Sequence, residues 1–385
     1  MKITYFDNAA SSWPKPPGVA EAMMECVQDY AANPGRGSHS MAVRASRALF
    51  NARKQLAILF GVKNPVDISF APNATMALNQ AIKGYVRPGD HVITTSLEHN
   101  SVRRPLEQAK SAQAINLDYI TTDQQGYVKL EELKETVRPD TRLVVINHSS
   151  NLLGSIQPIG EMSALVKSIA PNAKILVDAA QSAGIIPINV EQMGIDMLAF
   201  PGHKGLYGPQ GTGGLYLHPE LELVPLLHGG TGSQSEAIEQ PVVRPDRYEA
   251  GTQNTPGIAG LAAGVKFVLQ ETVEAIHEKE WALTQQMMEG LCSLNGIHIL
   301  GTGQGVTRTG IVAFTIEGKD SSEVAFWLDR HYNIAVRSGY HCTPLAHESA
   351  GTLGRGAVRA GIGYFNTADE VSYFIESIAE ICKKH

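Results

Sequence analysis

The amino-acid sequence predicts an α/β protein in which a large domain with a mostly parallel sheet is followed by a smaller α+β domain. Two observations predict this class. Between Asp67 and Pro201, short apolar, β-rich runs alternate with stretches of helical periodicity, as in βα units whose helices cover both faces of a parallel sheet. After about Gly230 the alternation ends, and loop-like sequence leads into a long helical pattern. This change indicates a second unit, which suits a chain of 385 residues.

The elements of the predicted sheet follow one another in a regular order. Each apolar run precedes an amphipathic or polar helical stretch, as expected for strand–helix units. The predicted strands are 67–72, 91–96, 115–120, 142–149, 174–180 and 197–201. The predicted helices are 75–84, a segment from about residue 100, 130–137 and 160–170.

The C-terminal region has a different pattern. A helix is expected from about Gly257 through Leu291, followed by a strand over 310–318 and a helix over 321–332. A Gly-rich loop then surrounds Cys342, and a closing helix begins near Ala368. Mixed strands and helices of this kind favour a small α+β domain.

The composition excludes several classes of protein. With 43% hydrophobic and 18% charged residues, the chain is typical of a globular protein with a large interior. The formal charge of −6 and the lack of a basic run argue against nucleic-acid binding. We expect no signal peptide and no membrane span. The four scattered cysteines favour reduced thiols in the cytoplasm over a disulfide framework or a zinc site.

Polar side chains follow the predicted strands at the points where ligands collect in open α/β sheets. They are Asn73 to Thr75, Glu98 and His99, Asn147 to Asn151, Asp178 to Gln181, and His203 with Lys204. We therefore expect the functional site at this edge of the sheet.

Lys204 stands alone in the segment AFPGHKGLYGPQGTGG. No Asp, Glu, Arg or other Lys occurs between Asp196 and Glu220. A surface lysine needs no such setting. A lysine that acts as a nucleophile does, because poor solvation and nearby positive groups disfavour its ammonium form.

Asp178 ends the apolar run KILVD, 26 positions before Lys204. A carboxylate at the end of a buried strand needs a cationic or hydrogen-bonding partner, although capping of the next helix explains such a residue equally well on its own. An aspartate and an isolated lysine after neighbouring strands suit a pyridoxal phosphate site. The lysine forms a Schiff base with the aldehyde, and the aspartate keeps the pyridine nitrogen protonated.

Three further positions are candidates for contacts with the cofactor. Asn73, Ala74 and Thr75 open a helix whose N-terminus could bind a phosphate, although ordinary capping accounts for most such pairs. His203 is a second candidate phosphate donor. His99 could lie over a planar cofactor and transfer protons, whereas a lone histidine is more often an ordinary loop or core residue.

Together, these motifs resemble those of a known family. The chain is similar to the class V aminotransferase-fold enzymes that use pyridoxal phosphate, specifically the cysteine desulfurase and selenocysteine lyase group. The resemblance runs nearly end to end and is carried by FDNAASSWPKP, NPGRGSH, FAPNATMALN, LEHNSV, HSSNLLG, VDAAQS, GHKGLYGPQGTGG, YEAGTQN, RSGYHC and AVRAGIGYFNT.

The resemblance implies a role for each matching residue. Lys204 would form the Schiff base, Asp178 would hold the pyridine nitrogen, Gln181 the phenolic oxygen, and His99 would stack on the ring. The phosphate would be held by Ala74, Thr75, His203 and, from a second subunit, Thr252. The substrate would be bound by Asn151 and Arg359, with Asn33, Arg36 and His39 at the entrance. No metal is implied.

The resemblance also implies an architecture. It predicts pyridoxal-phosphate fold type I, with a mostly parallel seven-stranded sheet in the large domain and a homodimeric assembly. We expect residues 1–17 to join the small domain, 18–256 to form the large domain and 257–385 to form the small domain. Two departures are clear: Pro201 stands where Ser or Thr commonly donates to the phosphate, and Tyr340 stands where His is common. Which group donates to the phosphate in place of a hydroxyl at position 201 is left open.

Cys342 is the residue that discriminates among reactions on this fold. It lies in a Gly-, Pro- and Ser-rich segment beside His341, with Arg337 and Arg355 near in sequence. Loop placement and positive neighbours favour an exposed thiolate, although an incidental loop cysteine is the alternative from sequence alone. The other three cysteines occur in helical patterns, where a buried, inert thiol is expected.

The resemblance makes Cys342 the persulfide-forming cysteine. We therefore expect a cysteine desulfurase that releases L-alanine from L-cysteine and passes the sulfur to an acceptor protein. Selenocysteine lyase is the alternative, and an aminotransferase or other lyase of the same fold is a further one. The sequence leaves open the preference between L-cysteine and L-selenocysteine, the acceptor and the pathway.

Overall fold

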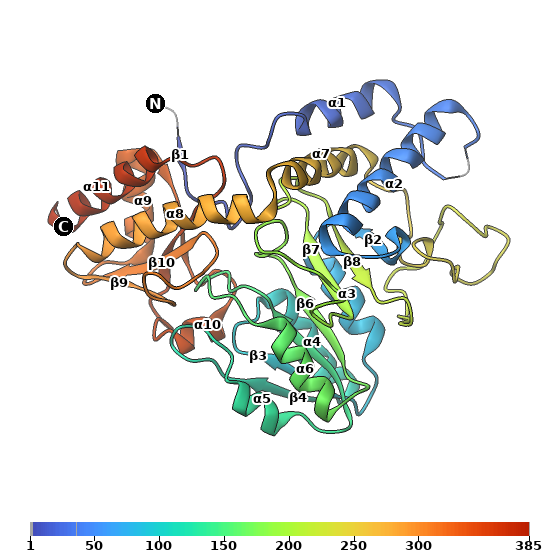
Figure 1. The fold of residues 1–385 in the computed structure, drawn as a ribbon, viewed down its shortest axis with the longest axis horizontal. Helices are drawn as coiled ribbons and strands as arrows, with labels where there is room; N and C mark the ends of the chain where they lie inside the picture. Colours follow the sequence, from blue (N-terminus) through green and yellow to red (C-terminus); the bar gives the residue numbers. More distant parts are fainter. Residues whose placement is uncertain (1–2, 36, 385) are drawn as a thin grey trace.

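The computed structural model describes residues 3–35 and 37–384. Within them, strands form a seven-stranded sheet (the large sheet), a four-stranded antiparallel sheet (the small sheet) and a parallel pair. Figure 1 shows two bodies, one around each of the two main sheets, with helix α8 (Val273–Cys292) reaching from one toward the other. We refer to them as the large body and the small body.

The large sheet has the strand order β2-β8-β7-β6-β5-β3-β4. Only β8 runs antiparallel to its neighbours β2 and β7 among the described pairings of this sheet. The predicted α/β class and mostly parallel sheet are therefore confirmed. The strands are β2 (Ile68–Ala71), β3 (His91–Thr95), β4 (Asn116–Ile120), β5 (Thr141–Asn147), β6 (Lys174–Asp178), β7 (Met197–Pro201) and β8 (Gly213–Leu217). Sequence patterning missed β8 because its two initial glycines have low strand propensity.

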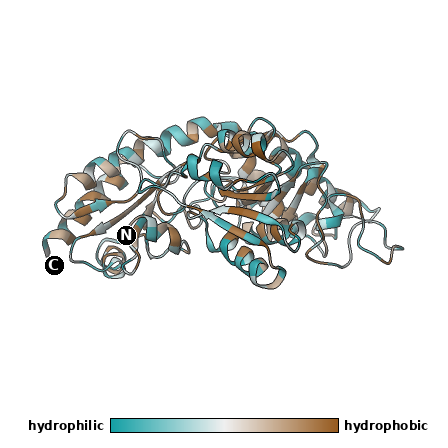
Figure 2. Cartoon of the chain, turned by 90° about the horizontal axis from the view of Figure 1, so that it is seen from below, coloured by the Kyte–Doolittle hydropathy of each residue, from teal (hydrophilic) through white to brown (hydrophobic). Residues whose placement is uncertain are grey.

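Helices cover both faces of the large sheet, because successive side chains of a buried strand point to opposite faces. In β6, Ile175 and Val177 join one hydrophobic core and Leu176 joins the other. In Figure 2 the strands of the large sheet are mostly brown, whereas the helices alternate brown and teal. The first core packs against α2 (Ser40–Phe60), α6 (Ile159–Ile169) and α7 (Thr255–Glu271), and the second against α3 (Ala74–Tyr85) and α4 (Asn100–Gln113). Helices α1 (Val19–Asp29) and α5 (Leu130–Thr136) complete this body.

The small body is built around the small sheet, with strand order β12-β13-β10-β9. Its core is formed with helices α8, α9 (Ser321–Tyr332) and α11 (Ala368–Lys384). The sheet strands are β9 (Ile297–Ile299), β10 (Ile311–Ile316), β12 (Arg337–Gly339) and β13 (Ala357–Gly361), and a short helix α10 (Pro344–Ser349) lies between β12 and β13 in the chain. Strand β1 (Thr4–Tyr5) pairs with β11 (Ile334–Ala335).

The predicted long helix over 257–291 is wrong in one respect. The chain turns at Thr272, whose φ is +67°, so that two helices, α7 and α8, replace one. Helix α7 packs against α1 and α2 and contributes Leu261 and Val265 to the core of the large body. The boundary at 256/257 stays a prediction, and we propose from this packing that the large domain extends to the end of α7. The β1–β11 pairing supports the proposal that residues 1–17 join the small domain.

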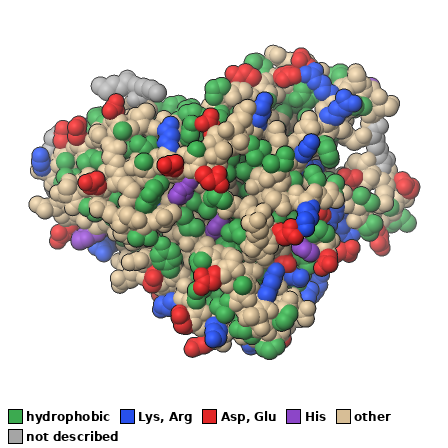
Figure 3. Space-filling model, viewed as in Figure 1, with side chains coloured by type: hydrophobic (Ala, Val, Ile, Leu, Met, Phe, Trp, Pro, Cys, Tyr) green, Lys and Arg blue, Asp and Glu red, His purple; other side chains and the backbone are tan. Residues whose placement is uncertain are grey.

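The surface carries both signs of charge. On the face shown in Figure 3, Lys and Arg side chains are interspersed with Asp and Glu. Among the described residues, no helix is both long enough and apolar enough to span a membrane.

Candidate active site

The parallel strands β3, β5, β6 and β7 end at one edge of the large sheet, and residues that follow them form much of the candidate site. In the register of β5, β6 and β7, Asp178 lies between Asn147 and Ala199. Lys204 follows β7 by three residues. His99, Asp178 and Arg359 all lie near enough to Lys204 to interact with it electrostatically. The structure therefore brings together these side chains, which the sequence analysis selected.

The glycines around Lys204 are required by close packing. A Cβ on Gly202 would lie 2.1 Å from the Thr212 hydroxyl oxygen, and one on Gly205 would lie 2.5 Å from the Ala183 carbonyl oxygen. Neither distance is compatible with a side chain. The segment is also held from the N-terminal side, because the Ser12 hydroxyl donates to the Lys204 carbonyl at 2.9 Å. Close packing at Gly202 and Gly205 and the hydrogen bond from Ser12 thus hold the backbone of Lys204 in place.

The amine of Lys204 is poorly solvated and surrounded by charge. Burial and, to a smaller extent, the Arg359 guanidinium together lower its pKa from 10.5 to about 8, while the charge of Asp178 opposes the shift. A lysine with this pKa is substantially neutral just above neutral pH, as a nucleophile or general base requires.

Asp178 is 2% exposed at the end of β6. Burial raises its pKa to about 6, although the Ala180 N–H, which donates to Oδ1 at 3.0 Å, and the charge of Lys204 favour the ionised form. The carboxylate is therefore charged at neutral pH but incompletely compensated. A cationic group placed beside it would supply the missing charge.

Glu98 is a buried carboxyl that the sequence analysis assigned no role. It is fully buried, and its Oε1 accepts from the Thr95 hydroxyl at 2.7 Å and from the Asn147 N–H at 3.0 Å. Burial and the nearby charge of Asp178 raise its pKa to about 8, although its hydrogen bonds oppose the shift. Glu98 is thus protonated at neutral pH and adds no charge beside Asp178. Its place next to His99, directly after β3, was the signal available in the sequence.

His99 is held in one tautomer by its neighbour Ser101. Its Nδ1 lies 3.1 Å from the Ser101 N–H, which donates to it, and 2.9 Å from the Ser101 hydroxyl. A ring nitrogen that accepts carries no proton, so the proton lies on Nε2. Burial and the charges of Lys204 and Arg359 lower the pKa of His99 to about 4. The ring is therefore neutral and presents one N–H donor.

The predicted phosphate-binding residues lie at the N-terminus of α3. Asn73 caps this helix by accepting from the Met76 N–H at 2.9 Å. The hydroxyl of Thr75 lies 2.7 Å from that of Ser101 at the start of α4. Two helix N-termini thus meet here, and both favour an anion.

His203 and Gln181 both contact the N-terminal segment of the chain. Burial lowers the pKa of His203 to about 4, and its Nδ1 has no hydrogen-bond partner among the described residues. Gln181 donates to the Ala9 carbonyl at 3.0 Å. Pro201 ends β7 and has no hydroxyl or N–H with which to donate to a phosphate.

Arg359 is a buried arginine tied to both bodies. Its Nη1 donates to the Asn151 carbonyl at 2.9 Å and its Nη2 to Asp7 at 3.3 Å. The other oxygen of Asp7 accepts from Arg337 at 3.1 Å. The Nε of Arg359 has no partner among the described residues. A buried, unpartnered donor of this kind suits a carboxylate ligand. Asp7, which the sequence analysis did not select, positions both arginines.

Cys342 is an exposed residue in the loop between β12 and α10. Two hydrogen bonds hold this loop against the large body. The Asn151 side-chain amide donates to the His341 carbonyl at 2.7 Å, and the Asn100 N–H donates to the Cys342 carbonyl at 2.9 Å. The exposed thiol predicted at this position is thus present beside the edge that carries Lys204.

Two expectations about the cysteines need correction. His341 is buried, and burial lowers its pKa to about 3, so that it supplies no positive charge beside Cys342 at neutral pH. Cys292, expected to be buried, is exposed because it ends α8. Cys26 is buried as expected and Cys382 is half-buried.

The predicted entrance residues lie apart from this cluster. Asn33, His39 and Thr252 line a pocket of about 650 Å³ whose described lining residues do not include Lys204 or Asp178. Arg36 lies outside the described residues. The structure thus groups the entrance residues with Thr252, which the resemblance assigns to a neighbouring subunit's site.

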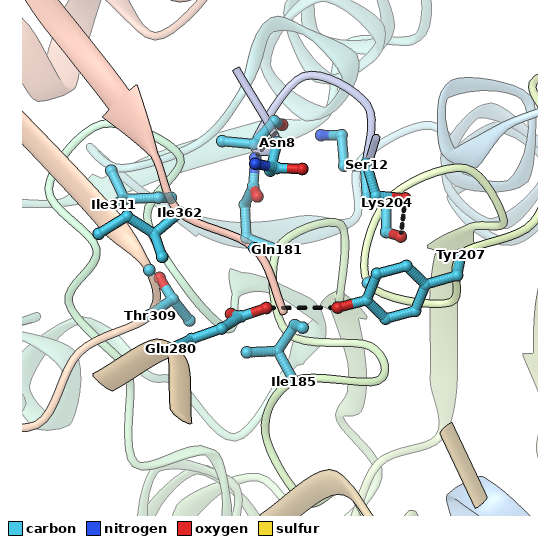
Figure 4. A pocket seen from close by; sticks show the side chains of 14 residues that line it. Asn8, Ser12, Gln181, Ile185, Lys204, Tyr207, Glu280, Thr309, Ile311 and Ile362 are labelled. Atoms are coloured by element: carbon cyan, nitrogen blue, oxygen red, sulfur yellow. Dashed lines mark hydrogen bonds between the residues drawn. The ribbon is translucent and has the colours of Figure 1, made fainter. Parts of the chain in front are cut away.

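A smaller cavity of about 40 Å³ lies beside Lys204. Figure 4 shows Gln181 and Asn8 on one side of it and Tyr207 with Glu280 on another. The Tyr207 hydroxyl donates to Glu280 at 3.4 Å, and burial raises the pKa of Glu280 to about 8. Because α8 carries Glu280, this cavity lies where the two bodies meet.

Comparison with known proteins places these features in a family. The model of the aminotransferase class-V family matches residues 4–374. The chain is 36% identical to a probable cysteine desulfurase of Methanothermobacter thermautotrophicus, over 98% of this chain and 94% of that protein. It is 34% identical to one of Pyrococcus abyssi, over 100% and 95%. A cysteine desulfurase of Thermococcus onnurineus, solved in its apo form, is similar in structure with a TM-score of 0.93 and 34% identity, over 100% of this chain and 95% of that one.

Proposed function

The chain belongs to the cysteine desulfurase family of class-V aminotransferases, and from this premise we propose that it removes sulfur from L-cysteine and releases L-alanine, with Lys204 and Cys342 as its catalytic residues. The observation that carries the proposal is the fastening of the Cys342 loop. Its two hydrogen bonds to Asn100 and Asn151 hold an exposed thiol beside the edge that carries the buried amine of Lys204.

The residues at this edge fit pyridoxal phosphate, on which the family generally depends. The incompletely compensated carboxylate of Asp178 would meet the pyridine nitrogen, and Gln181 the phenolic oxygen. The amides of Ala74 and Thr75 at the start of α3, with His203, would hold the phosphate. When bound through Lys204, the cofactor takes up the electrons released at the substrate's Cα.

Lys204 and His99 have different roles at the reacting carbon. With a pKa near 8, the amine of Lys204 holds or releases a proton close to neutral pH, which suits removal of the Cα proton. His99 presents a neutral Nε2–H, so it orients and donates a hydrogen bond rather than acting as an imidazolium acid.

Arg359 and Asn151 would bind the carboxylate of the substrate. The unpartnered Nε of Arg359, together with an Nη, forms the fork that a carboxylate occupies. The side-chain NH₂ of Asn151 has two donors, and one of them holds the Cys342 loop through the His341 carbonyl, so the other would donate to the carboxylate. Substrate and loop therefore share one anchoring residue.

Cys342 would accept the sulfur. Its thiolate attacks the substrate's Sγ, so that an S–S bond forms and the Cβ–Sγ bond breaks with its electron pair left on carbon. Protonation at Cβ then yields alanine, and the persulfide on Cys342 is passed to an acceptor. The exposure of Cys342 suits transfer to an acceptor protein.

We propose that the active unit is a homodimer, located in the cytoplasm. Thr252, Asn33 and His39 share a pocket of about 650 Å³, and Phe50 on its wall is 52% exposed. This pocket combines an exposed apolar side chain with polar residues that lie apart from Lys204 of the same chain. The combination supports a site that a second copy of the chain completes. Sedimentation at assay concentration would test it, since a fully active monomer contradicts shared sites.

The decisive experiment compares products. Alanine and sulfide from L-cysteine are measured against alanine and selenide from L-selenocysteine, with and without a thiol acceptor. Alanine formation from L-cysteine that needs Cys342 supports the proposal. Equal turnover without Cys342 contradicts it and points to another lyase or an aminotransferase on the same fold.

A further inference from the structure

The backbone that carries Cys342 is in an unfavourable conformation. His341 and Cys342 have φ angles of +49° and +59°, a left-handed region that side chains with a Cβ seldom adopt. Two consecutive residues of this kind persist only where surrounding contacts hold them. The hydrogen bonds to their carbonyls come from Asn100 and Asn151 in the large body. The contacts from the small body come from a buried pair of histidines.

His347, in α10, is fully buried under this turn. Its ring stacks on that of His341, with centroids 5.7 Å apart and planes within 11°. It also meets the Tyr340 ring edge to face, at 5.4 Å and 82°. His347 thus contacts both residues that precede Cys342.

The polar contacts of the two rings form one chain with a definite direction. His341 Nε2 lies 3.5 Å from the Arg337 carbonyl, which only accepts, so Nε2 carries the proton and Nδ1 accepts. His347 Nε2, 3.5 Å from that Nδ1, is then the donor of this contact, and the ring also makes a backbone hydrogen bond to Tyr340. His347 Nδ1 accepts from the Thr352 hydroxyl at 2.7 Å, a contact shorter than the 3.4 Å from this hydroxyl to the His347 carbonyl.

This arrangement requires both rings to be neutral. Burial lowers the pKa of His341 to about 3 and that of His347 to about 4, so both are neutral at neutral pH. In this state each ring has one donor and one acceptor, and every contact of the chain is satisfied. Of the residues assigned to the cofactor or the substrate, Arg359 acts on His341 through its charge, which also lowers the pKa of that ring.

We propose that His347 is a positioning residue for sulfur transfer, which holds the left-handed turn at His341 and Cys342 and thereby the thiol that attacks the substrate's sulfur. The inference rests on the proposed function. It predicts that His347 affects the step that needs the thiol and leaves the removal of the Cα proton intact, because Lys204 and Asp178 lie on the other body.

The test separates these two steps in the full-length holoenzyme. Exchange of the Cα proton of L-alanine in D₂O reports on Lys204 and needs no thiol. First-turnover persulfide formation on Cys342 from L-cysteine, followed by mass spectrometry, reports on the turn. Both are measured with Cys292→Ser present throughout, because Cys292 is a second exposed thiol.

His347→Ala is expected to slow persulfide formation roughly ten- to a hundred-fold, as misplaced reacting groups do, while alanine exchange stays within about twofold. His347→Gln should recover most of the loss, because its side-chain amide can donate from the position of Nε2 to His341. His331→Ala, an exposed histidine on α9 of the same body, is the matched control and should change neither rate.

Two results would overturn the inference. One is persulfide formation by His347→Ala at the wild-type rate, and the other is an equal loss of both activities in the Gln variant. If His347→Ala does not fold, His347→Gln is compared with His347→Leu, and equal rates in the two contradict a role for the Nε2 donor. A wild-type enzyme that exchanges alanine but forms no persulfide instead contradicts the proposed function itself.

Discussion

The two halves of the candidate site obtain reactivity in opposite ways. Lys204 and Asp178 are enclosed at the ends of β7 and β6, where burial moves their pKa values toward neutrality. Cys342 lies in solvent on a loop whose backbone is left-handed. Proton transfer within a site needs groups whose pKa values burial has moved toward neutral pH. Passing sulfur to another molecule instead needs a thiol that this molecule can reach. The large body supplies the first environment and the small body the second.

The largest effect is expected from removing the buried amine. Lys204→Ala should lower both alanine exchange and sulfur release by roughly 10⁴-fold, because one group acts as nucleophile and base. Lys15→Met is a matched control. Burial also lowers the pKa of Lys15 to about 8, and its Nζ lies 2.9 Å from the His203 carbonyl, beside the same segment. A comparable loss in the control would contradict a special role for Lys204.

The exposed half is tested by Cys342→Ala. Alanine formation from L-cysteine should be abolished, because the thiolate is a poor leaving group unless a nucleophile takes its sulfur. Alanine exchange in D₂O should persist, and activity on L-selenocysteine should be largely retained, because selenium leaves more readily. Cys292→Ser, which removes the other exposed thiol, should change none of these rates. Wild-type turnover of L-cysteine in the Cys342 variant would make this an ordinary loop cysteine.

The two arginines on Asp7 allow a comparison of buried and exposed charge. Arg359 is 3% exposed, whereas the side chain of Arg337 is 52% exposed. Arg359→Leu should raise KM for L-cysteine roughly ten- to a hundred-fold, the value of a charge-assisted hydrogen bond in a buried site. Arg337→Leu should raise it only a few-fold. Steady-state kinetics on both variants checks this order, and the reverse order contradicts it.

The pKa of Lys204 predicts a pH dependence. Because it falls from 10.5 to about 8, the neutral fraction of the amine rises about tenfold per pH unit below 8 and levels off above it. The rate at which cofactor-free protein takes up pyridoxal phosphate should follow this curve. Arg359→Leu should move the midpoint upward, since Arg359 lowers the pKa. A rate independent of pH between 6 and 9 is incompatible with this assignment.

The smallest effect on activity is expected from Glu98→Gln, because Glu98 is already protonated at neutral pH. Its effect on stability depends on pH. In the unfolded chain the carboxyl ionises above about 4.5, but in the folded protein only above about 8. Between these values folding takes up a proton, so the free energy of unfolding of the wild type falls as pH rises. The Gln variant does not titrate there, and its relative stability should increase up to pH 8 and then remain constant. Urea unfolding at several pH values measures the difference.

Local patterning was sufficient for the elements of the large sheet that predicted the fold. Buried parallel strands must be apolar and their helices amphipathic, so β3, β5, β6 and β7 are recognisable without knowledge of their neighbours. Residues directly after such strands necessarily meet at one edge, which is why Asp178 and Lys204 could be paired from sequence. The strand β8 and the break at Thr272 were missed, since a glycine-rich strand and a single left-handed residue leave no periodic signal.

What the sequence by itself determined about this protein is therefore the α/β class, the edge that carries the site and the chemical type of its lysine, aspartate and cysteine. Only the tertiary structure decided that Asp7 bridges two arginines, that Glu98 is kept neutral, that Cys292 is exposed, and that Asn33 and His39 lie with Thr252 and apart from Lys204. Each of these depends on contacts between residues far apart in the chain. Burial and charge at such contacts are properties of the packed molecule, because they are set by which surfaces meet and not by the residues on either side in the sequence.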